Sequence, residues 1–201
     1  MRIAILDRLL LLLTSLLAAW QVAVGIDGAE ALPLIAYTTG FGVLLVAGLL
    51  IIILGWEALE SPAVVILSTI IPLSLSLGLV WEHLVSLRLV YLIFAACGFL
   101  AIIITRLVGI HNQMPAWVLT VVHGLAGMTI FVLPLLRVIT GEAKPAFALV
   151  GIGGGILGLE GLLLSFLKIG KPLLPKATIL KFMPGVLCLT TAAFILGFSA
   201  R

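Results

Sequence analysis

Residues 34–55, LIAYTTGFGVLLVAGLLIIILG, form a run of 22 residues without a charged side chain. A helix of about 20 residues crosses the hydrocarbon core of a bilayer, which is about 30 Å thick. A helix that is apolar on every face has no side to present to water. We therefore predict that this run is a transmembrane helix.

Similar apolar runs fill most of the chain. Bounded by Pro, Gly and charged residues, they place predicted spans near 5–25, 34–55, 63–81, 87–107, 116–136, 146–167 and 179–198. Of the 201 residues, 63% are hydrophobic and only 9% are charged, whereas a soluble domain carries about 25% charged residues. The predicted fold is all-α: a polytopic transmembrane helical bundle of about seven spans, in a single domain over 1–201 with no soluble domain.

Two boundaries leave an alternative open. In the first predicted span, an apolar run from Leu9 follows Arg2 and Arg8, as in a signal peptide. Asp7 interrupts this basic region, and we therefore expect the segment to be retained as a span. The turn over residues 82–88 is short and partly apolar, so the third and fourth spans are alternatively one helix.

The ends of the spans predict the orientation of the chain. Tryptophans at the span ends are typical of an interfacial aromatic belt, and all four lie there: Trp20, Trp56, Trp81 and Trp117. With seven spans, seven of the 11 lysines and arginines lie on the amino-terminal side. The positive-inside rule then predicts a cytoplasmic amino terminus. The membrane that we expect is a prokaryotic-type plasma membrane or an energy-converting membrane.

Two titratable side chains lie inside predicted spans. Glu160 and His123 each lie about 10 Å from the cytoplasmic end of their span. Their spans are consecutive and antiparallel, so we predict that the two side chains pair, directly or through water. Such a pair is a proton relay or a ligand for a polar head group, and the alternative is a structural hydrogen bond. Arg106 and His111 extend this polar region, although Arg106 also fits ordinary snorkelling.

Glycines mark the sixth predicted span. Pairs of small residues four positions apart let helix backbones approach closely, and we expect this span to pack against a helix of this chain or of another subunit. The glycines concerned are Gly151, Gly154, Gly155, Gly158 and Gly161.

The loop after this span is basic. Lys168, Lys171 and Lys176 are candidates for contact with anionic lipid head groups. The alternative is that these charges only determine the topology of the chain.

Several classes of site are not expected. Haem ligation within the chain needs two histidines at one depth on different helices, and His83, His111 and His123 provide no such pair. The two cysteines, Cys97 and Cys188, lack the spacing of a metal site. No nucleophile has a matched base at its depth, so we expect no catalytic residues and no independent catalytic activity.

The leading hypothesis is a small integral membrane subunit of a larger complex of respiratory or photosynthetic energy conversion. Quinone or protons would make contact near His123 and Glu160, and the partners would be lipids and other membrane subunits, not nucleic acid. One alternative is a small transporter or channel with a cytoplasm-facing polar cavity, in which spans interrupted by Pro72, Pro134 and Pro184 move. The other alternative is a lipid-handling membrane protein.

Overall fold

The computed structural model describes residues 3–108, 112–168 and 170–200. In this part of the chain, seven helices are long and apolar enough to cross a membrane. They are α1 (Ile5–Val24), α2 (Ala31–Leu54), α3 (Pro62–His83), α4 (Arg88–Leu107), α5 (Met114–Ile139), α6 (Ala148–Lys168) and α7 (Lys176–Phe198). The predicted all-α, seven-span class is confirmed, and every predicted boundary lies within three residues of the observed one.

Three short 3-10 helices complete the described secondary structure. They are η1 (Trp56–Glu60), η2 (Val85–Leu87) and η3 (Pro145–Phe147). η2 separates α3 from α4, because the backbone leaves the helical conformation at Leu84 (φ −132°, ψ 69°). Arg88 stabilises this turn by donating from Nε to the carbonyl oxygen of Trp81 at 2.6 Å. The third and fourth spans are therefore two helices.

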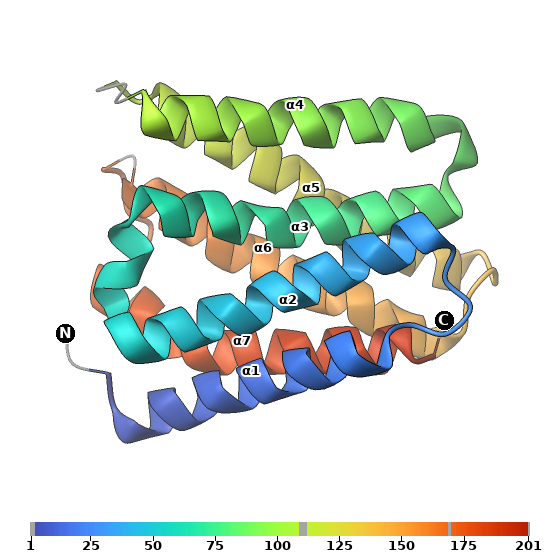
Figure 1. Cartoon of the computed structure of the whole chain (residues 1–201), viewed down its shortest axis with the longest axis horizontal. Coiled ribbons are helices and arrows are strands. Elements are labelled where there is room, and N and C mark those ends of the chain that lie inside the picture. Colours follow the sequence, from blue (N-terminus) through green and yellow to red (C-terminus); the bar gives the residue numbers. More distant parts are fainter. Residues whose placement is uncertain (1–2, 109–111, 169, 201) are drawn as a thin grey trace.

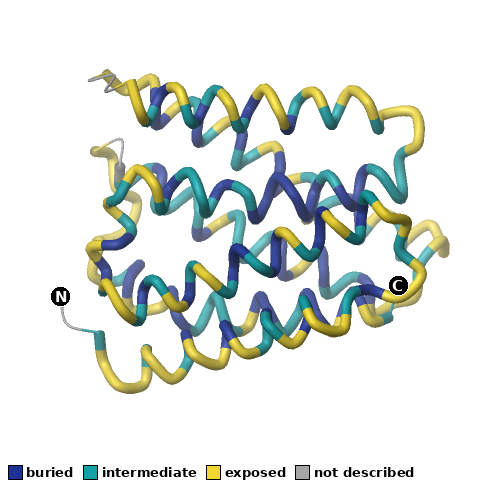
Figure 2. Tube along the Cα trace, viewed as in Figure 1, coloured by how far each residue is buried: buried dark blue, intermediate teal, exposed yellow. Residues whose placement is uncertain are grey.

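The helices run side by side along the long axis of the molecule, with consecutive helices antiparallel (Figure 1). α3 lies in the centre of the bundle. In an 18-residue apolar stretch of this helix 61% of the residues are buried, against 17% in the corresponding stretch of the fourth span. α4 packs mainly on α3 and α5, and α1 packs on α2 and α7. The exposed residues accordingly follow the outer faces of α1 and α4 (Figure 2).

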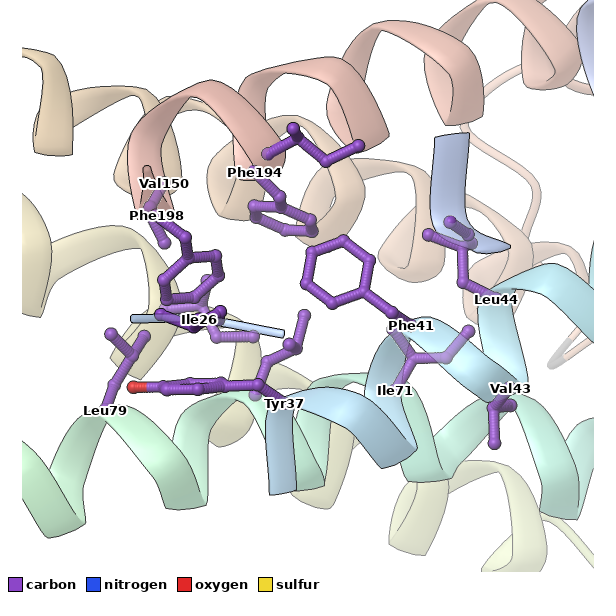
Figure 3. Packing of buried hydrophobic residues seen from close by; sticks show 14 of the residues in the cluster. Ile26, Tyr37, Phe41, Val43, Leu44, Ile71, Leu79, Val150, Phe194 and Phe198 are labelled. Atoms are coloured by element: carbon purple, nitrogen blue, oxygen red, sulfur yellow. The ribbon is translucent and has the colours of Figure 1, made fainter. Parts of the chain in front are cut away.

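An aromatic cluster fills the core toward the end of the bundle where α7 ends. Figure 3 shows Tyr37 and Phe41 of α2 facing Phe194 and Phe198 of α7. The ring centroids of Tyr37 and Phe198 are 4.6 Å apart. The hydroxyl of Tyr37 also donates to Glu82 Oε2 of α3 at 2.8 Å. The cluster thus joins α7 to α2 and α3, which are distant from it in sequence.

The five glycines that the sequence singled out on α6 face α5, whereas Gly153 faces Phe194 of α7. A Cβ atom at Gly154 would lie 2.9 Å from the Cβ of Ile130, and one at Gly151 would lie 2.7 Å from the carbonyl oxygen of Phe131. Gly155 and Gly161 meet Phe131 and His123 of α5 in the same way, whereas a Cβ at Gly158 would make only an ordinary contact with Gly127, at 3.8 Å. The absence of side chains therefore allows these two backbones to lie against each other.

Replacing Gly154 with alanine is expected to lower the free energy of unfolding by about 1–3 kcal/mol, because the added methyl overpacks the α5–α6 contact. Gly124 of α5 is the matched control, since a Cβ there meets nothing within 4 Å. Its replacement with alanine should stabilise the helix by about 0.5–1 kcal/mol. Unfolding in mixed detergent micelles measures both values, and shifts of the same sign would contradict this account of the glycines.

Candidate functional site

His123 and Glu160 lie at one depth in the bundle. His123 is nine residues from the first residue of α5, and Glu160 is eight residues from the last residue of α6. At about 1.5 Å per residue, both lie about 12–14 Å from the end of the bundle where α1 begins. The two side chains line one cavity with a volume of about 130 Å³.

The walls of this cavity are mostly apolar. They come from α2, α3, α5, α6, α7 and η1, with Leu44, Ile71 and Met183 as examples. Besides His123 and Glu160, the polar side chain in the wall is Ser68 of α3, whose hydroxyl donates to the carbonyl oxygen of Val65 at 3.0 Å. The oxygen of this hydroxyl remains able to accept a hydrogen bond.

Glu160 is only 8% exposed. Among the described residues, no hydrogen bond or ion pair joins Glu160 to His123. A carboxyl group with so little exposure is costly to keep without a polar partner, so Glu160 favours a water molecule or a ligand in the cavity. The structure brings the two residues to one space, and their predicted pairing through water stays a prediction.

Gly161 determines where the imidazole of His123 lies. A Cβ atom at Gly161 would overlap Nε2 of His123, so the ring lies against the backbone of α6. A second cavity, of about 80 Å³, shares His123, Gly161 and Ser68 with the first and adds Ser165. His123 therefore faces both spaces.

Other predicted site residues lie elsewhere. Arg106, at the end of the peripheral helix α4, donates from Nη2 to the carbonyl oxygen of Pro115 at 3.4 Å and does not line the cavity. His111 lies outside the described residues, as does the side chain of Lys168. Lys171 is exposed, and Lys176 forms an ion pair with Glu60 at 2.6 Å.

Two neighbours of the site escape sequence reasoning. Ser68 lies six residues into α3, at nearly the depth of His123, so the expectation that no nucleophile has a base at its depth is wrong for this pair. Counting residues along the two spans could have found it. Leu59 of η1 also lines both cavities, but the sequence after residue 55 reads only as the end of a span.

The cavity has room for one small ring. An apolar cavity of about 150 Å³ in another protein holds benzene, which is close in size. A ring that enters here meets aliphatic walls and, at one side, the titratable groups of His123 and Glu160. Among the described residues, no group of three His, Cys, Asp or Glu side chains comes together.

The fold defines a polytopic helical membrane protein, and its bundle contains a cavity lined in part by His123 and Glu160. No known protein family, curated protein or solved structure matches the chain.

Proposed function

We propose that this protein is a small membrane subunit that binds the head group of a quinone-type molecule in the cavity between α2, α3, α5, α6 and α7. The observation that carries the proposal is the convergence of His123 and Glu160 on one ring-sized space inside the bundle.

The chemistry of the wall complements a quinone ring. Such a ring is flat and apolar, with carbonyl oxygens that accept hydrogen bonds. A neutral imidazole has one N–H donor, and a protonated carboxyl has one O–H donor. His123 and Glu160 can therefore each donate to a carbonyl oxygen, while the aliphatic side chains pack against the ring.

A bound quinone exchanges electrons only with a redox partner. We therefore expect the chain to lie beside cofactor-bearing subunits of a larger membrane complex. Gentle detergent extraction should then recover the protein together with such subunits, seen as haem, flavin or chlorophyll absorbance in the purified fraction. If the chain elutes alone, it is not a subunit of such a complex. The proposal that the chain binds a quinone is tested separately.

Binding of a short-tailed benzoquinone to the purified protein in nanodiscs tests the site. Replacing His123 or Glu160 with leucine should weaken binding about tenfold each, the loss of one hydrogen bond to the ligand. Each change replaces a polar side chain of a mostly apolar cavity with an apolar one, so the fold should persist. Glu142→Gln, at an exposed position near the end of α5, is the control, and an unmodified protein that binds no quinone would sink the proposal.

A small transporter is the second candidate, and one feature of α3 favours it. Pro72 lines the cavity and has no N–H, so the carbonyl of Ser68 lacks its helical hydrogen bond. Interrupted helices with exposed backbone carbonyls form the binding sites of many transporters. Uptake of solute into liposomes that contain only this protein would favour the transporter over the complex subunit.

A further inference from the structure

The second cavity beside His123 lies closer to the end of the bundle where α1 begins than the ligand cavity, the space assigned above to the quinone. The residues that line the second cavity alone are Val65 of α3, Leu119 of α5 and Ser165 of α6. α3 and α5 begin at that end and α6 finishes there. Val65 and Ser165 are each three residues, about 5 Å, from that end of their helix. The second cavity thus lies between His123 and the surface of the bundle.

The second cavity is suited to hold water. Its volume is about 80 Å³, whereas one water molecule needs about 10–15 Å³ and a few polar partners. Ser68, Ser165 and His123 supply the polar groups. The two hydroxyls donate to carbonyl oxygens of their own helices, at 3.0 Å and 2.9 Å, so each hydroxyl oxygen can still accept a hydrogen bond from water.

Toward the opposite end, the ligand cavity ends on packed apolar side chains. Leu44 and Ile71 in its wall belong to the buried aromatic cluster. Phe41, Phe194 and Val150 of the same cluster follow toward that end (Figure 3). Close-packed apolar side chains leave no room for a row of water molecules, and the lipid chains on the flanks of the bundle hold no water either. Water therefore reaches His123 from the end where α1 begins.

We propose that the second cavity is a water-filled inlet through which protons from the aqueous phase at the end where α1 begins reach His123. The ring of His123 lines both cavities and so links the inlet to the ligand cavity. The use of these protons rests on the proposed function. A quinone that becomes a quinol takes electrons from the redox partner and an equal number of protons, which convert its carbonyl oxygens into hydroxyls. The inlet supplies these protons from one side of the membrane.

Thiol accessibility in nanodiscs, where both faces of the bilayer meet the solution, tests for the inlet. In a protein that carries Cys97→Ala and Cys188→Ala, Ser165→Cys should react with silver ion at least about tenfold faster than Val150→Cys. The two positions are matched, since each lies within three residues of an end of α6 and they are 3% and 0% exposed. Equal rates, or faster reaction at position 150, would overturn the inlet.

Filling the second cavity tests its link to His123. Ser165→Leu places an apolar side chain there and should prevent silver ion from reaching Ser68→Cys, at a position that lines both cavities. It should also stop the exchange of the ring N–H of His123 with deuterated solvent, measured by nuclear magnetic resonance on isotope-labelled histidine. Cys97→Leu adds the same side chain at an exposed position on α4 and should change neither measurement. Silver reaction and exchange that persist in Ser165→Leu would overturn the proposal. Should that variant fail to fold, the two thiol rates of the first experiment decide.

Quinone binding separates this proposal from the proposed function. Ser165 does not line the ligand cavity, so Ser165→Leu should leave the dissociation constant of the benzoquinone unchanged. A protein with a reactive thiol at position 165 that binds no quinone would retain the inlet and overturn the proposed function. A protein that binds quinone but shows equal rates at the two thiols would overturn the inlet alone.

Discussion

Replacing Phe198 with alanine is expected to lower the free energy of unfolding by about 3–5 kcal/mol, the usual cost of removing a buried phenyl ring. Phe198 is 2% exposed and is the last residue of α7. Its ring centroid lies 4.6 Å from that of Tyr37 and 6.3 Å from those of Phe41 and Phe147. Each such aromatic pair adds to the burial of the ring, so the loss should exceed that of an isolated phenylalanine.

Leu196→Ala is the matched control for this substitution. Leu196 lies in the same turn of α7 but is 58% exposed, on a face that would contact lipid. Lipid chains solvate either side chain there, so the change should be small, well under about 1 kcal/mol. Unfolding by SDS in mixed micelles, followed by circular dichroism, compares the two variants. Similar losses would show that the aromatic cluster does not hold α7 in place.

Replacing Ala47 with phenylalanine is expected to weaken quinone binding more than about 100-fold. The cavity has room for one ring, and the phenyl ring of the new side chain would occupy it in place of the quinone. Ala47 of α2 lines the cavity of about 130 Å³ that also contains the side chains of His123 and Glu160. Filling a cavity commonly adds about 0.5–2 kcal/mol of stability, so the variant should fold at least as well as the unmodified protein. Lost affinity with retained stability is the signature of a filled ligand site.

Val46→Phe controls for the added ring. Val46 is the neighbouring residue on α2, and at 43% exposure it lies on the outer face. Its replacement should leave both the quinone dissociation constant and the unfolding transition unchanged. If Ala47→Phe binds quinone as tightly as the unmodified protein, the ligand occupies another place and the cavity has lost its proposed role.

The spans were predictable because the bilayer fixes their length. The run at residues 34–55 and the helix Ala31–Leu54 agree because a helix must keep apolar residues over the whole hydrocarbon thickness. The separation of α3 from α4 was less evident, since the polar turn is short. Arg88 decides it by bonding to the backbone of Trp81, a contact that no hydropathy pattern contains.

The sequence predicts how deep the site residues lie along their helices, but it does not predict which face of each helix turns toward the interior of the bundle. Counting residues places His123 and Glu160 at one level, yet spans that are apolar on all sides do not reveal which face turns inward. The central position of α3, and with it the role of Ser68, therefore did not follow from the sequence. Trp56 also departs from the predicted aromatic belt, because Gly55, with φ of +80°, turns η1 back over the bundle and buries the indole.

The contact between α1 and α7 governs when the protein can become complete during synthesis. The chain leaves the ribosome from its amino terminus, and domains generally fold in that order. Yet α1 packs on α7, and Met183 and Leu187 of α7 line the cavity. Nascent chains that stop before residue 176 thus lack part of the cavity wall and leave the aromatic rings of α2 uncovered. Lipid chains would cover these rings until α7 enters the bilayer and replaces them.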